Sequence, residues 1–372
     1  MSRLFSPIAL GGATLPNRIV VAPMCQYSAV DGCATDWHLQ HWTQLAISGA
    51  GLVVVEATAV ERRGRISHGC LGLYSPANVA AMARALRAAR RFGVPQTRFA
   101  IQLAHAGRKA SCQIPWEGGA PLTRDQDAWP VVGPSALPFG ETSQVPEALD
   151  AAGLERVLEA FVKAAQLAVE LGFDAIELHC AHGYLLHEFL SPIANHRTDQ
   201  YGGPLENRMR FPLAVAAAVR AAVPPGVALG ARITGTDWRE DGINEAEASA
   251  FAGALKAGGF DYLCVSSGAI APKIKIPVGP GYQVALATRI KQAAQIATRT
   301  VGMIVSPEQA ELIVASGQAD LVALARAFLD DPRWPWHAAE ALGAEIEVPP
   351  QYRLGYAKFW PGAKLARPKV AE

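Results

Sequence analysis

The sequence lacks an excess of charge of either sign and lacks any long apolar run. Its 372 residues include 34 Lys plus Arg and 33 Asp plus Glu, a formal net charge of +1. This balance provides no electropositive field for holding nucleic acid, which argues against an RNA or DNA substrate. No apolar stretch approaches the roughly 20 residues that a membrane span requires, so we expect no membrane association.

Paired cysteines are also missing. The 6 cysteines, at positions 25, 33, 70, 112, 180 and 264, form no C-x-x-C motif and no disulfide framework. The start of the chain, residues 1–5, has no long apolar core of the kind found in a secretory signal peptide. We therefore expect a soluble cytoplasmic protein with reduced thiols.

What the sequence does contain is an alternation of short apolar runs with Ala-rich segments that carry helix signals. The runs are continuous, as expected for parallel strands that are covered on both faces. Ser75–Pro76 and Ser306–Pro307 each offer a capping serine followed by proline at the first helical position. The predicted strands are residues 19–22, 52–56, 99–103, 175–178, 228–233, 262–266, 300–305 and 321–325.

This alternation predicts an α/β fold, a (β/α)8 TIM barrel. The length would allow two domains, but closed barrels reach this size as one, so we expect a single domain over residues 1–372. An open doubly wound sheet usually has a Gly-rich turn after its first strand. Residues 23–27, PMCQY, stand at that point instead, so no dinucleotide-binding fingerprint opens the chain.

Three segments depart from the regular alternation. Residues 4–15 hold two apolar pieces around Gly11–Gly12, which we interpret as an N-terminal hairpin that plugs one barrel end. Residues 104–152 are too long for a plain barrel loop and predict a functional insertion or lid after strand three. The C-terminal tail, residues 349–372, is basic and aromatic, and it packs either on the barrel or on a neighbouring subunit.

Polar side chains gather at the predicted C-terminal strand ends, where the active sites of such barrels lie. Strand four is followed by His179, His182 and Tyr184. With a turn of helix after this strand, residues three apart point the same way, so both imidazoles can meet one ligand atom. Tyr184 would stand beside them as a proton donor. A helix that opens at Ala325–Arg326 offers backbone donors and an arginine for a phosphate.

Other interpretations of these residues stay open. Two histidines three apart are compatible with a metal pair, but no carboxylate falls at a neighbouring strand end to complete it. Either histidine could be a core residue, and Arg326 could serve as a helix cap or in a salt bridge. A Schiff-base mechanism needs a strand-end lysine, whereas Lys109 lies in the predicted insertion. A non-enzymatic ligand binder would have no use for the proton donor.

Several stretches resemble the Old Yellow Enzyme flavoproteins, in particular the xenobiotic reductases and the thermophilic-like ene-reductases. The matching stretches are residues 17–27 (NRIVVAPMCQY), 55–60 (VEATAV), 102–109 (QLAHAGRK) and 179–208, which starts HCAHGYL and ends ENR. The likeness runs from residue 4 to about residue 352. Its most specific part is the run 179–208.

This resemblance implies an NADPH-dependent ene-reductase with non-covalently bound FMN, acting on α,β-unsaturated carbonyl compounds and also on nitro compounds. It implies that His179 and His182 bind the carbonyl oxygen, and that Tyr184 protonates the α-carbon. Cys25 would modulate the flavin, and Tyr27 would reach the substrate. By matching position, the flavin contacts would be Pro23, Met24, Cys25, Ala57, Gln102, Arg232, Gly302, Ala325 and Arg326.

Within this resemblance, Gln102 is expected to donate to the pyrimidine edge of the flavin, Arg232 to face its N1/O2 edge, and Arg326 to lie near the phosphate. Ala325–Arg326 replaces the Gly-Arg that is usual in the family. We expect a homodimer or homotetramer that acts on small-molecule enones. Whether Arg353, Tyr356 and Trp360 of the tail complete a neighbouring active site stays open. Two alternative enzymes fit less well: a tRNA-reducing flavin barrel wants a basic face, and a metal-dependent hydrolase wants carboxylates.

Overall fold

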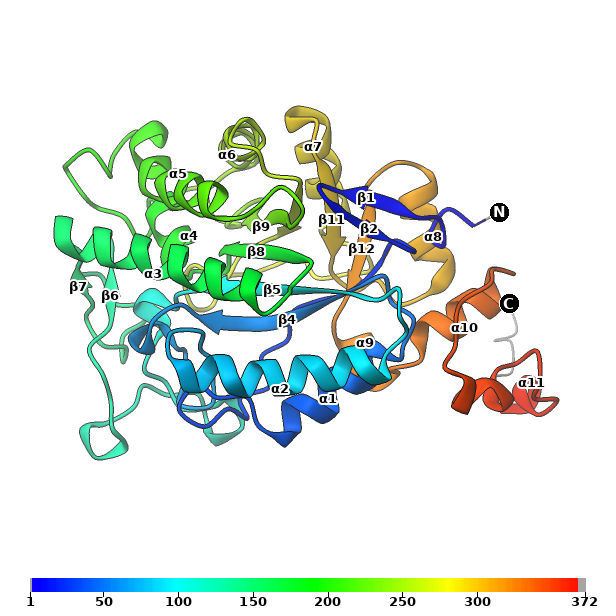
Figure 1. Cartoon of the computed structure of the whole chain (residues 1–372). Helices are drawn as coiled ribbons and strands as arrows, with labels where there is room; N and C mark the ends of the chain where they lie inside the picture. Colours follow the sequence, from blue (N-terminus) through cyan, green and yellow to red (C-terminus); the bar gives the residue numbers. More distant parts are fainter. Residues whose placement is uncertain (1, 367–372) are drawn as a thin grey trace.

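A computed structural model describes residues 2–366 and shows eight parallel strands closed into a barrel (Figure 1). The predicted (β/α)8 architecture is confirmed. In sequence order the barrel strands also follow one another around the barrel, and β12 pairs with β3 to close it. They are β3 (Ile19–Val21), β4 (Leu52–Ala59), β5 (Arg98–Ala104), β8 (Ala175–Cys180), β9 (Ala228–Thr234), β10 (Tyr262–Ser266), β11 (Ala297–Val301) and β12 (Leu321–Leu324).

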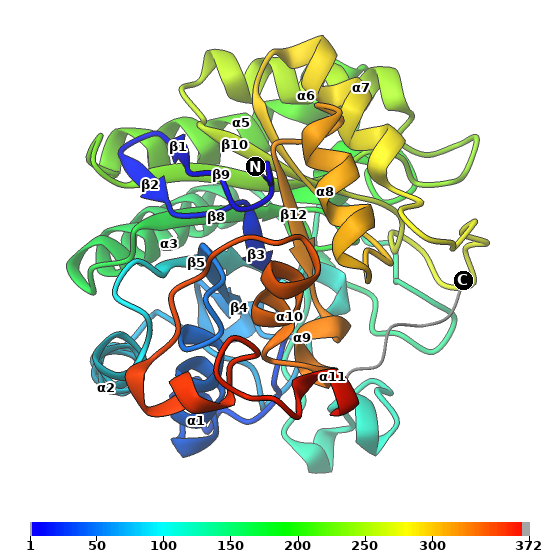
Figure 2. The same ribbon diagram turned by 90° about the vertical axis from the view of Figure 1, so that its right-hand side faces the viewer.

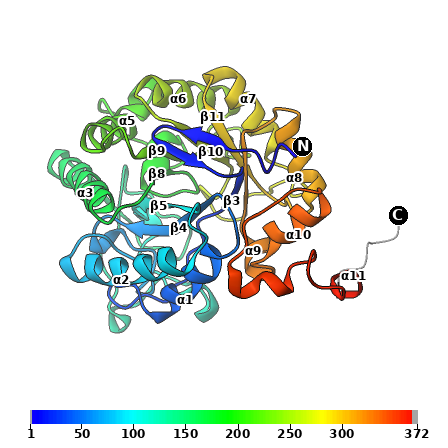
Figure 3. The same ribbon diagram turned by 45° about the vertical axis from the view of Figure 1, so that its right-hand side comes forward.

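Helices surround this barrel (Figure 3). Both predicted caps form: the hydroxyls of Ser75 and Ser306 accept backbone N–H groups. In addition, Asn244 makes a capping box with Glu247. The helices are α1 (Asp36–Ala46), α2 (Pro76–Phe92), α3 (Ala151–Glu170), α4 (Leu185–Leu190), α5 (Leu205–Ala222), α6 (Glu245–Ala257), α7 (Val284–Ala294), α8 (Pro307–Ala315), α9 (Arg326–Asp330), α10 (Trp334–Ala341) and α11 (Ala363–Ala366).

The seventh strand lies three residues earlier than predicted. The run 300–305 is apolar, but Met303 and Val305 are exposed, and Met303 has a positive φ of 48°. The strand itself, β11, begins at Ala297 and carries Arg299 into the barrel interior. The prediction was wrong because it followed the apolar run. The strand instead includes Arg299, a charged residue that is buried because it pairs with Glu177 in the core.

The barrel interior contains that charge as part of a buried ion pair. Arg299 contacts the carboxylate of Glu177 on β8, and both side chains are 0–1% exposed. The Arg299 guanidinium also lies over the Tyr262 ring, 5.5 Å from its centroid. Because burial removes both ions from water, each depends on the other for its compensation.

A hairpin closes one end of the barrel, as predicted. Its strands, β1 (Ile8–Leu10) and β2 (Ala13–Leu15), pair antiparallel. Leu10 and Leu15 pack on barrel residues such as Val54 and Leu321. Figure 2 views the molecule from this end, with the hairpin in front of the strands. The hairpin thereby covers the N-terminal ends of the strands.

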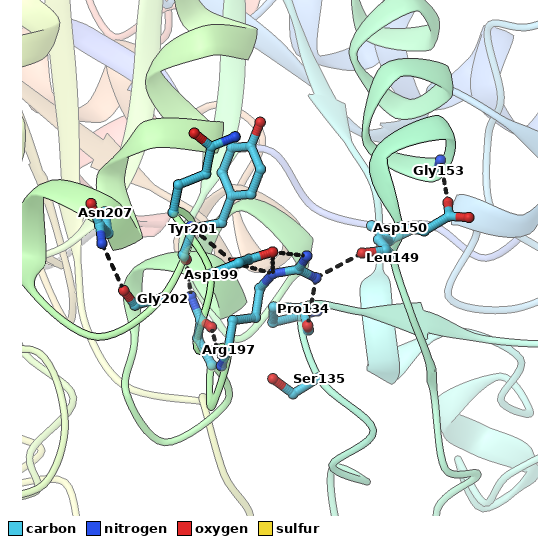
Figure 4. A network of polar contacts seen from close by, with 12 residues as sticks. Pro134, Ser135, Leu149, Asp150, Gly153, Arg197, Asp199, Tyr201, Gly202 and Asn207 are labelled. Atoms are coloured by element: carbon cyan, nitrogen blue, oxygen red, sulfur yellow. Dashed lines mark hydrogen bonds and ion pairs between the residues drawn. The ribbon is translucent and has the colours of Figure 1, made fainter.

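The segment between β5 and α3 lies at that opposite end (Figure 1). It contains the 3-10 helices η2 (Gly107–Lys109), η3 (Pro115–Glu117) and η4 (Arg124–Gln126), and the short strands β6 (Val132–Gly133) and β7 (Glu147–Ala148). Arg197 fastens it to the barrel: its guanidinium donates to the carbonyls of Pro134 (3.0 Å) and Leu149 (2.7 Å) and pairs with Asp199 (Figure 4). The run 195–199 of the family resemblance is therefore an anchor for this segment.

The C-terminal tail packs on its own chain as far as the structure describes it. The ring of Tyr352, in η5 (Pro350–Gly355), lies 6.0 Å from that of Trp336 on α10 and 4.1 Å from the Arg333 guanidinium. Figures 1 and 2 place the tail at the hairpin end of the barrel. Residues 367–372 of the predicted tail lie outside the described residues. Within residues 2–366, every helix is too short or too polar to cross a bilayer.

We expect the Arg299→Met substitution to lower the free energy of unfolding by roughly 3–5 kcal/mol, because it leaves the Glu177 carboxylate buried without a counter-charge. Urea denaturation measures this loss. The control is Arg289→Met, which removes the surface ion pair with Glu245 and should cost about 1 kcal/mol or less. Equal losses in the two variants would contradict the role given to the buried pair.

Candidate active site

The predicted His, His and Tyr side chains come together at the end of β8. His179 lies within the strand, and Tyr184 is the N-cap of α4. The ring centroid of His179 is 5.2 Å from that of His182 and 4.8 Å from that of Tyr184, each pair in an edge-on arrangement. Three polar rings therefore share one small volume.

The backbone reaches this arrangement by a different route from the one expected. No turn of helix joins the histidines; His182 and Gly183 have positive φ values of 60° and 71°. A Cβ at Gly183 would lie 2.4 Å from the Ala269 carbonyl oxygen, so only glycine fits this close approach. The two consecutive left-handed residues reverse the chain and carry the second imidazole back beside the first.

Polar contacts hold this turn from two sides. The Gly183 N–H donates to His187 Nδ1 at 2.8 Å, and His187 Nε2 lies 3.2 Å from a carboxylate oxygen of Asp237. On the other side, the Lys109 ammonium donates to the carbonyls of His182 (2.8 Å) and Ala269 (3.2 Å). These contacts hold the turn in a fixed position against buried groups.

Burial sets the protonation states in the cluster. It holds the pKa of His179 and of His182 well below the usual 6.5, with the Arg232 charge as a further cause, so both imidazoles are neutral. Burial raises the pKa of Tyr184 well above 10, so the phenol keeps its proton. The His179 Nδ1 accepts the Ala181 N–H at 3.3 Å, which leaves Nε2–H as the free donor of that ring. The cluster offers donors to an oxygen without carrying charge.

Gln102 and Arg232 lie on the strands beside the cluster. Arg232 is the register partner of His179, is 7% exposed, and has no hydrogen-bond partner for Nε among the described residues. The Gln102 amide nitrogen donates to Glu177 at 2.8 Å. That bond uses one of the two N–H donors of the amide, so the second N–H and the carbonyl oxygen of Gln102 remain for a ligand.

The residues after β3 form one side of the site. Pro23, Met24, Cys25 and Tyr27 are half-buried, and Tyr27 has a φ of 49°. Burial raises the pKa of Cys25 well above 9, so the group is a thiol rather than a thiolate. The Tyr27 ring meets Trp116 of η3 edge-on at 5.9 Å. Tyr27, Lys109 and Tyr184 line a cleft of about 750 Å³ whose outer wall is the segment after β5.

The ends of β11 and β12 provide the remaining predicted residues. Gly302 follows β11 with a φ of 120°, and a Cβ there would press on Tyr282 and Gln283. Arg326 opens α9 after Ala325 and is exposed. Burial raises the pKa of Tyr282, and the positive charge of Arg326 partly lowers it again. Ala57, at the end of β4, lines a small cavity with Tyr184. The predicted site residues therefore lie either in the C-terminal halves of barrel strands, as Ala57, Gln102 and Arg232 do, or in the loops that follow them.

This donor set fits a flavin. The Arg232 guanidinium, with no partner at Nε among the described residues, and the Gln102 amide, which keeps one N–H and its oxygen, match the acceptors and the imide N–H of a pyrimidine edge. The cation at Arg326 suits a phosphate. The cleft lined by Tyr27, Lys109 and Tyr184 adjoins these groups through the Tyr184 ring, which packs on His179.

The comparison with known proteins agrees. Residues 3–345 match the NADH:flavin oxidoreductase / NADH oxidase family. The chain belongs to this family. It is 42% identical over 355 residues to the NADPH dehydrogenase of Geobacillus sp. (strain WCH70), covering 95% of this chain and 98% of that protein.

Solved structures extend the likeness to the Old Yellow Enzymes. Morphinone reductase in complex with tetrahydroNAD superposes with a TM-score of 0.73 at 28% identity, covering 96% of this chain and 97% of that one. The Old Yellow Enzyme homologue from Zymomonas mobilis gives 0.77 at 25% identity, covering 93% and 94%. This protein is an Old Yellow Enzyme-type oxidoreductase that uses FMN and NADPH.

Residues that the sequence interpretation missed stand directly behind the site. Glu177 and Ser266 lie on barrel strands and contact Gln102 and His182. Ser266 is the last residue of the predicted sixth strand, so an inspection of all eight strand ends would have found it. Glu177 could not be found in this way, because it lies inside a predicted strand, where a residue is assigned to the core.

Glu188 provides a pH-dependent test of the packing around the site. Its carboxylate is fully buried on α4, accepts the Arg108 N–H at 2.8 Å, and has a pKa raised by burial to about 8 from 4.5. A raised folded-state pKa means that stability is lost as the pH rises from 4.5 towards 8, because only the unfolded chain ionises freely. Glutamine can accept the same N–H without ionising.

We therefore expect Glu188→Gln to match the wild type at pH 5 and to exceed its thermal midpoint by roughly 2–4 °C at pH 8. Differential scanning calorimetry of the FMN-loaded protein at the two pH values measures this. Glu141→Gln, at an exposed glutamate of the segment after β5, is the control and should show no such pH dependence. A Glu188→Gln effect of the same size at both pH values would contradict the buried, protonated carboxyl.

Proposed function

We propose that this enzyme is an ene-reductase that reduces the C=C bond of α,β-unsaturated carbonyl compounds. When bound, FMN supplies the hydride, from N5 to the β-carbon of the substrate, after reduction by NADPH. The observation that carries the proposal is the convergence of two neutral imidazoles and a protonated phenol at one strand end, with ring centroids 4.8–5.2 Å apart. Such a group of donors suits an α,β-unsaturated carbonyl compound, in which the carbonyl oxygen and the α-carbon both become more negative when hydride is added.

His179 and His182 hold the carbonyl oxygen of the substrate. That oxygen gains negative charge as hydride reaches the β-carbon, so donors placed there in advance stabilise the transition state. Their neutrality matters, because a neutral imidazole donates a hydrogen bond without surrendering its proton to the oxygen. Burial, and after it the nearby cation of Arg232, keeps both rings uncharged. The same cation would favour negative charge on the pyrimidine edge of a bound flavin.

Tyr184 delivers the proton to the α-carbon. Its elevated pKa keeps the phenol protonated across the neutral range, and a positioned general acid contributes roughly 10²–10⁴-fold to a rate. Tyr27 and Cys25 bound the substrate from the β3 side. Pro23, Met24, Ala57 and Gln102 hold the flavin ring, and Gly302, Ala325 and Arg326 hold its phosphate end.

The substrate class follows from the same groups. Nitro compounds also present an oxygen beside an electron-poor centre, so we include them as substrates. The cleft beside Tyr27 and Tyr184 is sized for small molecules. We further propose a cytoplasmic enzyme, in keeping with its free cysteines, that works as a homodimer or homotetramer.

We expect Tyr184→Phe to slow the reaction of the reduced enzyme with cyclohexenone by roughly 10²-fold or more, because the proton must then come from water. Reduction of the enzyme by NADPH should change little, since that step needs no proton at the α-carbon. Stopped-flow absorbance separates the two half-reactions. Tyr74→Phe is the matched control. Tyr74 lies outside the site, is half-buried, and its hydroxyl has no hydrogen-bond partner among residues 2–366. Equal slowing of both half-reactions would rule out the proton-donor role.

His179→Ala and His182→Ala should each weaken the binding of para-hydroxybenzaldehyde, whose phenolate oxygen takes the place of the substrate oxygen. Loss of one hydrogen bond to a charged group costs about 1.5–3 kcal/mol, so we expect a rise in Kd of roughly 10- to 100-fold. Titration of the long-wavelength charge-transfer absorbance of the FMN-loaded enzyme measures it. Unchanged titration curves in both variants would remove the basis for the oxygen-binding assignment.

A further inference from the structure

Ser266 contacts the second histidine of the site from β10, two strands away from β8 in the barrel. It is the last residue of β10, is 6% exposed, and its hydroxyl oxygen lies 2.7 Å from His182 Nε2. The backbone of Ser266 is fixed in turn, because its carbonyl accepts the Gly235 N–H at 2.8 Å. The contact therefore joins a rigid strand end to the turn that carries the imidazole.

The hydroxyl of Ser266 has one proton and two neighbouring acceptors. One is His182 Nε2; the other is the side-chain oxygen of Gln283, at 3.2 Å. A separation of 3.2 Å lies outside the usual range of about 2.5–3.0 Å for an O–H donor and an oxygen acceptor. The Gln283 oxygen also already receives the Ser267 hydroxyl at 2.7 Å. The shorter contact therefore favours donation from Ser266 to His182 Nε2 over donation to Gln283.

This assignment decides which nitrogen of His182 carries its proton. A neutral imidazole has one N–H and one acceptor nitrogen, and burial keeps His182 neutral. If Nε2 accepts from Ser266, the proton stands on Nδ1. Among residues 2–366, none hydrogen-bonds to that Nδ1. In His179 the roles are reversed, because its Nδ1 accepts the Ala181 N–H and its Nε2 carries the proton.

We propose that Ser266 is a positioning residue that fixes the ring of His182 and keeps its proton on Nδ1, so that a substrate oxygen meets His179 Nε2–H and His182 Nδ1–H. The proposal rests on the proposed function, since it specifies how that oxygen is bound. The surrounding turn supports it: Gly183 abuts the Ala269 carbonyl and Lys109 ties His182 to the same carbonyl, so the histidine backbone cannot compensate for a rotated ring.

Ser267 provides a matched control. It is as buried as Ser266, stands next to it, and donates to the same Gln283, but it makes no hydrogen bond with His182. Ser266→Ala should raise the Kd of para-hydroxybenzaldehyde for the FMN-loaded enzyme about tenfold, which corresponds to ~1.4 kcal/mol. Ser267→Ala should stay within about twofold of the wild type, and Ser266→Thr, which restores a hydroxyl, should recover most of the binding.

A second measurement reports the tautomer directly. Long-range proton–nitrogen correlation spectra of enzyme with isotope-labelled histidine distinguish the Nδ1–H from the Nε2–H form, and the His182 signals are those lost in His182→Ala. We expect the Nδ1–H pattern in the wild type and in Ser267→Ala, with Nε2–H signal growing in Ser266→Ala.

Two outcomes would overturn the inference: an Nε2–H pattern for His182 in the wild type, or equal ligand affinity in Ser266→Ala and Ser267→Ala. The histidine variants separate this failure from a failure of the proposed function. If His179→Ala and His182→Ala weaken the ligand but Ser266→Ala does not, only the role of Ser266 is wrong. If neither histidine variant weakens it, the oxygen-binding site itself is wrong.

Discussion

The close approach of Gly183 to the Ala269 carbonyl determines where the polar rings of the site lie. The two backbones come so near that a Cβ would be 2.4 Å from the oxygen, and Lys109 binds the carbonyls on both sides of the contact. This contact forces consecutive left-handed residues after β8. His182 and Tyr184 can meet His179 only because the chain reverses there.

Around this contact the protein arranges buried polar groups in connected pairs. Ser191 donates to Asp237, Asp237 faces His187, and His187 receives the Gly183 N–H, all in the interior. His187 Nε2 and Asp237 Oδ1 lie 3.2 Å apart without a hydrogen bond, so their opposite polarity offsets only part of the cost of burying them. Lys109 has a pKa lowered by burial to about 8, which leaves it close to losing its charge. A dry, fixed environment of this kind is what lets neutral imidazoles act as donors at no reorganisation cost.

The segment after β5 turns the open end of the barrel into a cleft. Arg197 and Arg108 both hold it by donating to backbone carbonyls, at Pro134 and Leu149 in one case and at Leu137, Pro138 and Ile270 in the other. Guanidinium groups suit this task, because their five donors can satisfy several carbonyls that lack a strand partner. The segment also places Trp116 against Tyr27. The arginine contacts that hold the segment therefore also shape the entrance of the cleft.

The sequence by itself determined the barrel, the family resemblance and the strand-end set. Continuous apolar runs and helix caps are local signals, and position at a strand end follows from them. It did not determine the place of β11, because Arg299 is tolerated inside only through Glu177 on a strand far away in the chain. It did not reveal that Gln102 is held by that same carboxylate, because Glu177 lies on another strand.

Only the tertiary structure decided how the rings meet and which nitrogen donates. The sequence suggested a helical turn between His179 and His182, whereas the fold uses two left-handed residues pressed against the loop after β10. Ser266 and His182 are 84 positions apart and come within 2.7 Å because β8 and β10 flank β9 in the closed barrel. Spacing along the chain determines which residues are neighbours on one helix or strand. The position of the proton on the His182 ring depends on the group that the fold brings beside that ring.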